Sequence, residues 1–276
     1  MNEQEREMYD FAYDLTRSAG CKLKQERLHS VIEVKEKTSQ MDLVTEHDLL
    51  IERILIAAIV AKYPGHGILA EESQGRVNAD SDGYTWVIDP IDGTVNYYRF
   101  GRDYAISLAL YRDGNPVFGL INDVASGVMF CAKHGEGAII DNCRLNILPE
   151  RREKMHKAIV AMSLRTMMEL ASLDMDVVGM LSRVQAYRYL GCASLELCRV
   201  ANGEYDLFIS SNTYEWDVAA ARIYLEQRGG FFLYRRKDKD NSRYGKIFVI
   251  AYRSPLIWEE VLEYFPKCIR NEFGYK

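Results

Sequence analysis

The chain contains the segment Trp86-Val87-Ile88-Asp89-Pro90-Ile91-Asp92-Gly93-Thr94, in which an apolar strand leads directly into two aspartates. Pro90 holds the residue before it, Asp89, in an extended conformation and contributes no N–H group. Gly93 permits a close turn, so we expect a turn that starts at Asp89 and aims the carboxylates of Asp89 and Asp92 at one point. Because Asp, Pro and Gly are all turn residues, an ordinary surface turn is the alternative.

The same turn supplies a third oxygen atom, the carbonyl oxygen of Ile91. Two carboxylates and a carbonyl are the ligands that hard divalent ions such as Mg²⁺ prefer. Thr94 follows at the position where a helix is expected to begin. The segment therefore predicts a Mg²⁺ site at the end of a buried strand.

Three further acidic clusters lie elsewhere in the chain, and each has an ordinary structural explanation. Glu71 and Glu72 follow a short apolar strand, and an acidic pair in that place is unremarkable. Asp217 stands at the start of an expected helix, where a carboxylate interacts favourably with the helix dipole. Thr45 and Asp48 have the spacing of a capping box before an apolar helix. Taken singly, these clusters do not identify a site.

The order of the expected elements indicates a layered α/β protein. Amphipathic spacing predicts a helix over residues 5–27 and a second helix that ends at Tyr63-Pro64-Gly65. Consecutive strands run from Tyr104 to Ile140, and the polar segment Arg144–Lys157 is the expected lobe boundary. Beyond it, strands at 158–162, 186–190, 205–209, 231–234 and 246–251 alternate with helices at 164–182, 194–202, 216–228 and 255–264.

The composition excludes several classes of protein. Of the 276 residues, 48% are hydrophobic and 27% are charged, which is ordinary for a globular chain and unlike a disordered chain or a coiled coil. The net charge of −5 gives no overall basic field to attract nucleic acid. No apolar stretch is long enough to span a bilayer, the six cysteines are scattered, and the first thirty residues lack a signal-peptide core. We therefore expect a cytoplasmic protein without nucleic-acid or membrane partners.

Taken together and in this order, the four clusters resemble the inositol monophosphatase-like superfamily of Mg²⁺-dependent, lithium-sensitive phosphatases. The matching elements are Asp42-Leu43-Val44-Thr45 with Asp48, then Glu71-Glu72-Ser73, then Trp86 to Thr94, then Trp216-Asp217. The resemblance implies an α/β sandwich of alternating helix and sheet layers, similar to inositol monophosphatase and fructose-1,6-bisphosphatase. It also implies a homodimer and one phosphatase domain over residues 1–276, with lobes at about 1–145 and about 146–276.

The resemblance further implies two Mg²⁺ ions, or three with a weaker ion near Glu71. Their ligands are Glu71, Asp89, the carbonyl group of Ile91, Asp92 and Asp217. Clustered carboxylates repel one another and are costly to bury without cations between them, which is consistent with this role. The metal ions lower the pKa of a bound water, and Thr94, hydrogen-bonded to Asp48, is expected to position that water for attack on phosphorus. The expected catalytic residues are therefore Asp48, Glu71 and Thr94.

The substrate side of the site is implied in the same way. Gly191 and Ala193 match positions that contact the alcohol part of the substrate, although Ser194 as an ordinary helix N-cap is the alternative. Ser210 stands seven residues before Asp217, where inositol-type members usually have a glutamate, and it lacks the charged acceptor that strengthens a hydrogen bond to a hydroxyl. The N–H groups of a helix start suit a phosphate oxygen. The expected substrate-binding residues are Asp92, Gly93, Thr94, Gly191, Ala193, Ser210 and Asp217.

Arg165 and Arg188 are candidates for binding a second anionic group on a larger substrate, with solvated surface arginines as the alternative. We expect hydrolysis of a small polyol or sugar phosphate by direct attack of metal-activated water. A nucleotide-type phosphate, such as 3′-phosphoadenosine 5′-phosphate or the 2′-phosphate of NADP, is the alternative within this class, and fructose 1,6-bisphosphate lies between the two. A non-catalytic protein that keeps this fold to bind a partner is the alternative from a different class.

Overall fold

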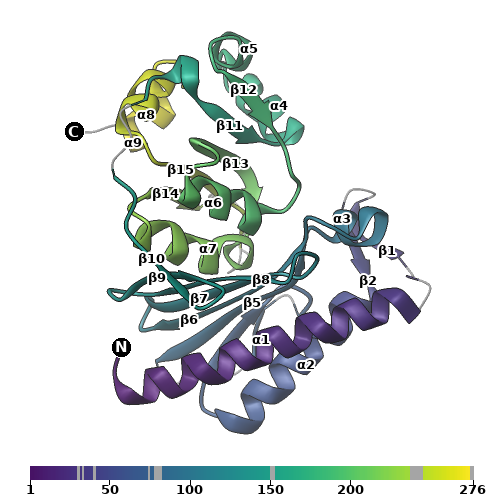
Figure 1. Cartoon of the computed structure of the whole chain (residues 1–276). Coiled ribbons are helices and arrows are strands. Elements are labelled where there is room, and N and C mark those ends of the chain that lie inside the picture. Colours follow the sequence, from purple (N-terminus) through teal and green to yellow (C-terminus); the bar gives the residue numbers. More distant parts are fainter. Residues whose placement is uncertain are drawn as a thin grey trace.

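Helices and sheets alternate in layers in the computed structural model of the chain (Figure 1). The structure describes residues 1–29, 32, 34–39, 42–73, 75–77, 83–149, 153–236 and 245–273. Within these residues the layers are a pair of long helices, an eight-stranded sheet, two central helices, a five-stranded sheet and a set of outer helices. The α/β class and the alternation of helix and sheet layers predicted from the sequence are confirmed.

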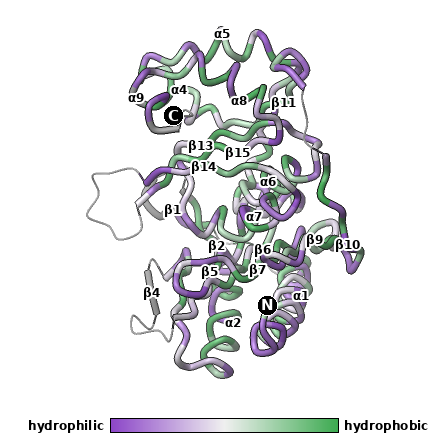
Figure 2. The backbone as a smooth tube through the Cα atoms, turned by 90° about the vertical axis from the view of Figure 1, so that its left-hand side faces the viewer, coloured by the Kyte–Doolittle hydropathy of each residue, from purple (hydrophilic) through white to green (hydrophobic). Residues whose placement is uncertain are grey.

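The first layer consists of α1 (Glu3–His29) and α2 (Glu46–Lys62), which lie where amphipathic spacing predicts them. In α1, Met8, Ala12 and Leu23 recur at helical spacing and are fully buried, while most of the charged residues lie outside this buried face. Figure 2 shows hydrophilic and hydrophobic residues mixed along α1. This apolar face packs on the eight-stranded sheet, mainly against β7.

The eight-stranded sheet has the strand order β10-β9-β8-β7-β6-β5-β3-β4. Its strands are β3 (Gly67–Ala70), β4 (Gly75–Val77), β5 (Tyr84–Asp92), β6 (Ala105–Arg112), β7 (Asn115–Asp123), β8 (Val128–Lys133), β9 (Gly137–Ile140) and β10 (Cys143–Leu145). The pair β3 and β5 is parallel, so both strands end at the same edge of the sheet. A separate antiparallel hairpin consists of β1 (Val34–Ser39) and β2 (Asp42–Thr45).

Strand β5 continues further than the sequence predicts. We expected a turn from Asp89, but the strand runs through Pro90 to Asp92, so this prediction is wrong. Between the pairs Asp89–Ser107 and Asp92–Ala105, two residues of β5, Pro90 and Ile91, lie opposite the single residue Ile106 of β6. The extra residue makes a bulge, and a bulge can accommodate a proline that has no N–H to donate to the sheet.

The central layer consists of α6 (Ala193–Asn202) and α7 (Glu215–Gln227). Helix α7 lies very close to β7, because a Cβ atom on Gly119 would stand only 2.5 Å from the carbonyl oxygen of Ala220. Glycine in the strand and alanine in the helix allow this approach. It brings the first turn of α7, with Asp217, to the edge of the sheet where β3 and β5 end.

The five-stranded sheet has the order β12-β11-β13-β15-β14, with β11 (Ile159–Met162), β12 (Ala186–Arg188), β13 (Leu207–Thr213), β14 (Phe231–Arg236) and β15 (Ile247–Tyr252). The outer helices are α4 (Leu164–Ser172), α5 (Val177–Leu181), α8 (Pro255–Leu262) and α9 (Lys267–Phe273). The single helix predicted at 164–182 is wrong: it divides into α4 and α5 at Asp174, which has a left-handed φ of 62°. Helix α9 was not predicted. The predicted N-cap Ser254, with proline at the first helical position, is confirmed for α8.

The two sheets take their strands from either side of the predicted boundary Arg144–Lys157, of which residues 150–152 lie outside the described residues. Fully buried Arg253 ties this crossing segment down, since its guanidinium donates to the carbonyl groups of Leu148 and Pro149 at 3.2 and 3.1 Å. The division into two lobes stays a prediction. No described helix is both long enough and apolar enough to cross a membrane.

Candidate active site

Helix α2 begins with a capping box that places a buried carboxylate at the site. The hydroxyl oxygen of Thr45 accepts the N–H of Asp48, and Asp48 Oδ2 accepts the N–H of Thr45 at 2.8 Å. The other carboxylate oxygen, Oδ1, lies 3.1 Å from the hydroxyl of Thr94, the first residue of α3 (Thr94–Phe100). Asp48 is fully buried. The capping box is thus present as predicted, and it aims Asp48 at Thr94.

The turn at Gly93 brings two distant segments together. Gly93 has a φ of 88°, in the left-handed region that favours glycine. A Cβ atom on Gly93 would stand 3.1 Å from the carbonyl oxygen of Asp103 and 3.2 Å from both the Gly191 carbonyl oxygen and Cys192 Cβ. The strand end that carries the aspartates therefore lies directly against the predicted substrate segment.

Asp89 lies at the centre of a group of carboxylates. It is 1% exposed, and its Oδ1 accepts the N–H of Ile91 at 3.1 Å. Burial raises the pKa of Asp89 well above its usual range, and the charges of Glu71, Asp92 and Asp217 raise it further. The structure therefore brings together four carboxylates that the sequence analysis singled out.

Asp92 reaches from the end of β5 to the first turn of α6. Its Oδ1 accepts the N–H of Ala193 at 3.1 Å. Its Oδ2 accepts both the N–H and the hydroxyl of Ser194, each at 2.6 Å, and also the thiol of Cys192 at 3.2 Å. Burial raises the pKa of Asp92, and the bonds from Ser194, Cys192 and Ala193 oppose this rise. The alternative in which Ser194 is the N-cap is wrong. The cap position is Cys192, whose side chain makes no capping bond, and Asp92 binds the helix start instead.

The carboxylate and carbonyl oxygens of this site are the type of ligand that Mg²⁺ prefers. Among the described residues, however, no three His, Cys, Asp or Glu side chains are already arranged to hold a metal ion. Asp217 Oδ2 accepts the N–H of Tyr214 at 2.9 Å at the start of α7. Carboxylates can accept at about four lone-pair positions, so these bonds leave room for a cation. A cation between the carboxylates would relieve the repulsion that raises the pKa of Asp89.

Two residues that the sequence analysis missed hold the segment before Gly191. Asn96 Nδ2 donates to the carbonyl oxygens of Leu190 at 2.8 Å and Asp103 at 2.9 Å. Glu196 Oε1 accepts the N–H of Leu190 at 2.7 Å, so both backbone groups of Leu190 are fixed. A sequence signal existed for Glu196, because it lies among apolar residues of α6 and acidic residues are rarely buried without a partner.

Glu196 gives a prediction on pH dependence. It is 3% exposed, and burial raises its pKa to about 7, with the bond from Leu190 opposing this rise. Folding raises this pKa, so Glu196 contributes fully to the free energy of unfolding below its unfolded-state pKa near 4.5. This contribution is lost as the pH rises through the folded-state pKa of about 7. Glu196→Gln keeps an acceptor oxygen but cannot ionise. The Tm of the variant minus the Tm of wild type should therefore increase from about pH 5 to about pH 8. Thermal unfolding in EDTA measures this, and a pH-independent difference in Tm would contradict the assignment.

The remaining predicted substrate residues are less closely connected to the carboxylates. Ser210 is 9% exposed on β13, and its hydroxyl oxygen accepts the N–H of Asn212 at 3.4 Å. Arg188 is exposed and donates to the carbonyl oxygen of Tyr187 at 2.8 Å, and Arg165 is exposed on α4. In the part of the chain that the structure describes, none of these three residues bonds to the carboxylates around Asp89. The side chain of Asp42 lies outside the described residues.

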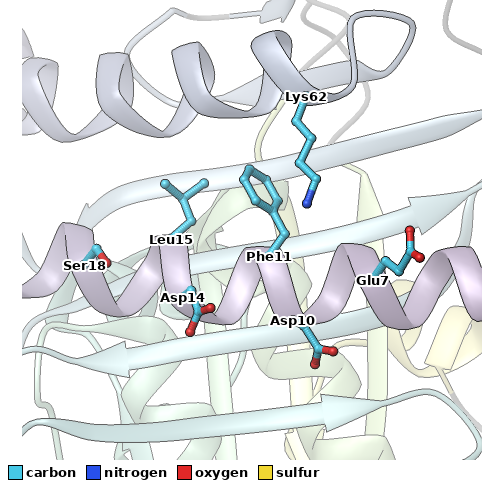
Figure 3. A pocket seen from close by; sticks show the side chains of 7 residues that line it. All are labelled: Glu7, Asp10, Phe11, Asp14, Leu15, Ser18 and Lys62. Atoms are coloured by element: carbon cyan, nitrogen blue, oxygen red, sulfur yellow. The ribbon is translucent and has the colours of Figure 1, made fainter.

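A separate hollow lies on the outer side of the first layer, between α1 and the end of α2 (Figure 3). Phe11 lies between the two helices there, and Lys62 Nζ stands 4.5 Å from the centre of its ring, a cation–π contact. Asp10 and Asp14 point away from Lys62. The hollow contains none of the predicted site residues.

A family model described as the inositol monophosphatase family matches residues 4–268. The chain belongs to the inositol monophosphatase family. Members of this family hydrolyse phosphate monoesters, so the chain is a phosphatase. The resemblance and the enzyme class predicted from the four acidic clusters are confirmed.

Individual relatives cover most of the chain. It is 34% identical to inositol-1-monophosphatase of Bacillus subtilis (strain 168) over 227 residues, which are 82% of this chain and 84% of that protein. A solved structure of 2′AMP-bound SaIMPase-II is similar with a TM-score of 0.76 and 26% identity, covering 94% of both chains. A solved IMPase/NADP phosphatase complexed with Mg²⁺ and phosphate shares the fold, with a TM-score of 0.79 and 23% identity over 95% of both chains.

Proposed function

We propose that this phosphatase depends on Mg²⁺ and hydrolyses a small polyol or sugar phosphate. The observation that carries the proposal is the buried Asp89 with three further carboxylates around it, beside the hydrogen-bonded pair of Asp48 and Thr94. Oxygen ligands for a cation and a pair of residues that can orient water thus lie at one place. Similarity to the Bacillus subtilis inositol-1-monophosphatase supports the polyol class.

The residues that would hold the metal each supply an oxygen atom near the end of β3 or β5 or the start of α7: Glu71, Asp89, the carbonyl of Ile91, Asp92 and Asp217. Mg²⁺ bound there supplies positive charge for the phosphate group and lowers the pKa of water. Two ions, or three with a weaker ion near Glu71, are part of the proposal. In a chain of net charge −5, such local positive charge is what an anionic substrate requires.

Thr94 and Asp48 are proposed to position the attacking water. The Thr94 hydroxyl has one proton and lies 3.1 Å from both Asp48 Oδ1 and the Ile91 carbonyl oxygen. It donates to one of these oxygens, so its own lone pairs can accept a hydrogen bond from water. Asp48 cannot turn away, because Thr45 holds its other oxygen. Glu71, beside Asp89, completes the proposed catalytic set.

The alcohol part of the substrate is proposed to lie against Gly191 and Ala193. Both are next to the carboxylates, since the N–H of Ala193 donates to Asp92 and the Gly191 carbonyl oxygen approaches Gly93. The N–H groups of Gly93 and Thr94 are proposed to contact a phosphate oxygen. Asp92 and Asp217 complete the proposed substrate contacts, together with Ser210 on β13.

The test of the proposal is phosphate release from a panel of esters, each assayed with Mg²⁺ and with EDTA. The panel contains myo-inositol 1-phosphate, sugar phosphates, fructose 1,6-bisphosphate, 2′-AMP, 3′-phosphoadenosine 5′-phosphate and NADP. Hydrolysis that EDTA abolishes, with the best kcat/KM for a polyol or sugar ester, supports the proposal. Hydrolysis that persists in EDTA would contradict the metal dependence.

Ser210 gives a prediction on specificity. A glutamate at this position would add a charged acceptor for sugar-like hydroxyl groups, and such bonds are stronger than neutral ones. Ser210→Glu is therefore expected to raise kcat/KM for myo-inositol 1-phosphate relative to 2′-AMP by about 10-fold, the effect of a charge-assisted bond worth about 1.4 kcal/mol. Steady-state kinetics on both substrates measure the ratio.

Ser210→Gln is the matched control, because it has the same length without the charge. It should shift the ratio much less than Ser210→Glu. If Ser210→Glu leaves the ranking of substrates unchanged, or if wild type strongly prefers inositol phosphate, the proposed role of position 210 is wrong.

A nucleotide-type phosphate is the second candidate substrate class. Ser210 in place of a carboxylate favours it, and so does the exposed Arg188 two residues before Leu190, with Arg165 as a second cation. The similar SaIMPase-II has been solved with 2′AMP bound. The ester panel separates the two classes, because a nucleotide enzyme would show its highest kcat/KM with 2′-AMP, 3′-phosphoadenosine 5′-phosphate or NADP.

The homodimer, inhibition by lithium and the cytoplasmic location stay predictions. Exposed apolar side chains on α4 and α5 support an interface, since Leu164, Met168 and Val178 are 67%, 65% and 81% exposed. The family membership leaves the non-catalytic alternative without support.

A further inference from the structure

Helix α2 has a buried stripe that changes character along its length. Asp48, Glu52, Leu55 and Ile59 recur three or four residues apart and are 0–3% exposed. The second half of the stripe is apolar and belongs to the core. The first half consists of two carboxylates one helical turn apart. Core packing does not account for this half, because buried carboxylates are costly and like charges at this spacing repel.

The carboxylate of Glu52 is directed at the acidic turn after β3. Its Oε2 accepts the N–H of Glu72 at 2.7 Å, and its Oε1 accepts the hydroxyl of Ser73. The N–H of Glu72 belongs to the same peptide group as the carbonyl of Glu71. Glu52 therefore fixes the peptide plane that leads out of Glu71, the residue beside Asp89.

The two carboxylates of the stripe thus hold two different loops of the site. Asp48 bonds to Thr94, the first residue of α3, just after β5, and one turn later Glu52 bonds to the turn that carries Glu71. Both loops are attached to one rigid helix, so their separation is set by the rise of a single helical turn. We propose that Glu52 is a positioning residue that holds Glu71 for Mg²⁺ binding, an inference that rests on the proposed function.

The need for such a holder follows from charge. Glu71 lies beside Asp89, and two neighbouring carboxylates repel when no cation lies between them, which tends to drive the turn away. Two hydrogen bonds to Glu52 oppose this movement. Glu71 is then already in place when the cation binds. Binding therefore does not have to include the free-energy cost of ordering the turn.

Glu52→Gln tests the proposal, because an amide has one acceptor oxygen and must lose one of the two bonds. The Kd for Mg²⁺, measured by calorimetry without substrate, is expected to rise about 10-fold, the lower range for residues that orient metal ligands. At saturating Mg²⁺, kcat should fall far less than the affinity does. Hydrogen exchange of the Glu72 amide should become faster. Ser73→Ala removes only the hydroxyl bond and should raise the Kd about 2- to 5-fold.

Glu5→Gln is the matched control for a general loss of stability. Glu5 on α1 is 4% exposed and, like Glu52, accepts a backbone N–H and side-chain donors, from Asn2 at 2.9 Å, Arg112 at 2.7 Å and the Tyr84 hydroxyl at 3.5 Å. Arg112 pairs with Tyr84, at the opposite end of β5 from Asp89. Glu5→Gln should lower the Tm without changing the Kd for Mg²⁺.

The outcomes separate the two proposals. If wild type binds no Mg²⁺, the proposed function fails and the role of Glu52 fails with it. If wild type binds Mg²⁺ and both Glu52→Gln and Ser73→Ala bind it equally well, only the role of Glu52 is overturned. The same holds if Glu5→Gln weakens binding as much as Glu52→Gln does.

Discussion

Asp89→Asn is expected to lower kcat/KM by about 1,000-fold or more, and at the same time to raise the Tm of the metal-free protein. The loss follows because one neutral ligand disrupts a shared metal site whose charge stabilisation is worth several kcal/mol. The gain follows because Asp89 is fully buried among Glu71, Asp92 and Asp217, which raise its pKa. Asparagine keeps the acceptor for the N–H of Ile91 and removes this repulsion.

The pH dependence of the metal-free protein checks the physical cause. The raised pKa of Asp89 means that its contribution to stability is present below the unfolded value of about 3.8 and is lost as the pH rises through the folded value. Asp89→Asn lacks this loss, so its advantage in Tm over wild type should grow from acidic to neutral pH. A change of about 1 kcal/mol corresponds to about 2–4 °C in a chain of this size class. Thermal unfolding in EDTA over this pH range measures it.

Asp206→Asn is the control for this pair of measurements. Asp206 is 3% exposed and its Oδ2 accepts the N–H of Ile159 at 2.9 Å, in the five-stranded sheet. The same substitution there should lower the Tm and leave kcat/KM close to wild type. Near-wild-type activity of Asp89→Asn at saturating Mg²⁺ would exclude Asp89 as a ligand.

Features of the fold that depend on neighbours in the chain could be predicted from the sequence. The capping box of Thr45 and Asp48, the glycine turn at Gly93 and the proline at the start of α8 all follow from local rules, and the structure contains each of them. The break between α4 and α5 could not be predicted this way. It depends on a left-handed aspartate, Asp174, in a segment whose apolar spacing continues across the break.

Features of the site that depend on distant contacts were harder to predict. Asp92 and Ser194 are about one hundred residues apart, so nothing in the spacing indicates that the aspartate binds the start of α6. The same applies to Asn96 and the backbone of Leu190. The acidic residues themselves could be found, because their types and order are distinctive. Their hydrogen-bond partners became evident only from the packing of α6 and α7 on the sheet.

Thr94→Ala is expected to separate the chemical step from metal binding. The substitution removes the hydroxyl that lies 3.1 Å from Asp48 Oδ1, while the carboxylates around Asp89 and the carbonyl of Ile91 remain. We expect kcat to fall about 100-fold or more, the effect of losing a group that orients a proton transfer. The Kd for Mg²⁺ should stay within about twofold, since a hydroxyl that only orients water contributes little to metal affinity.

Calorimetric titration with Mg²⁺ beside steady-state kinetics decides the matter, with Thr94→Ser and Val95→Ala as controls. Serine restores the hydroxyl and should recover most of kcat. Val95 is 44% exposed on the same helix turn, so its truncation should change neither kcat nor the Kd. A Thr94→Ala variant that loses Mg²⁺ affinity but keeps kcat at saturating metal would assign Thr94 to the metal site. In that case the assignment of Asp48 to positioning water would be wrong too, because Asp48 is proposed to act through the Thr94 hydroxyl that it binds.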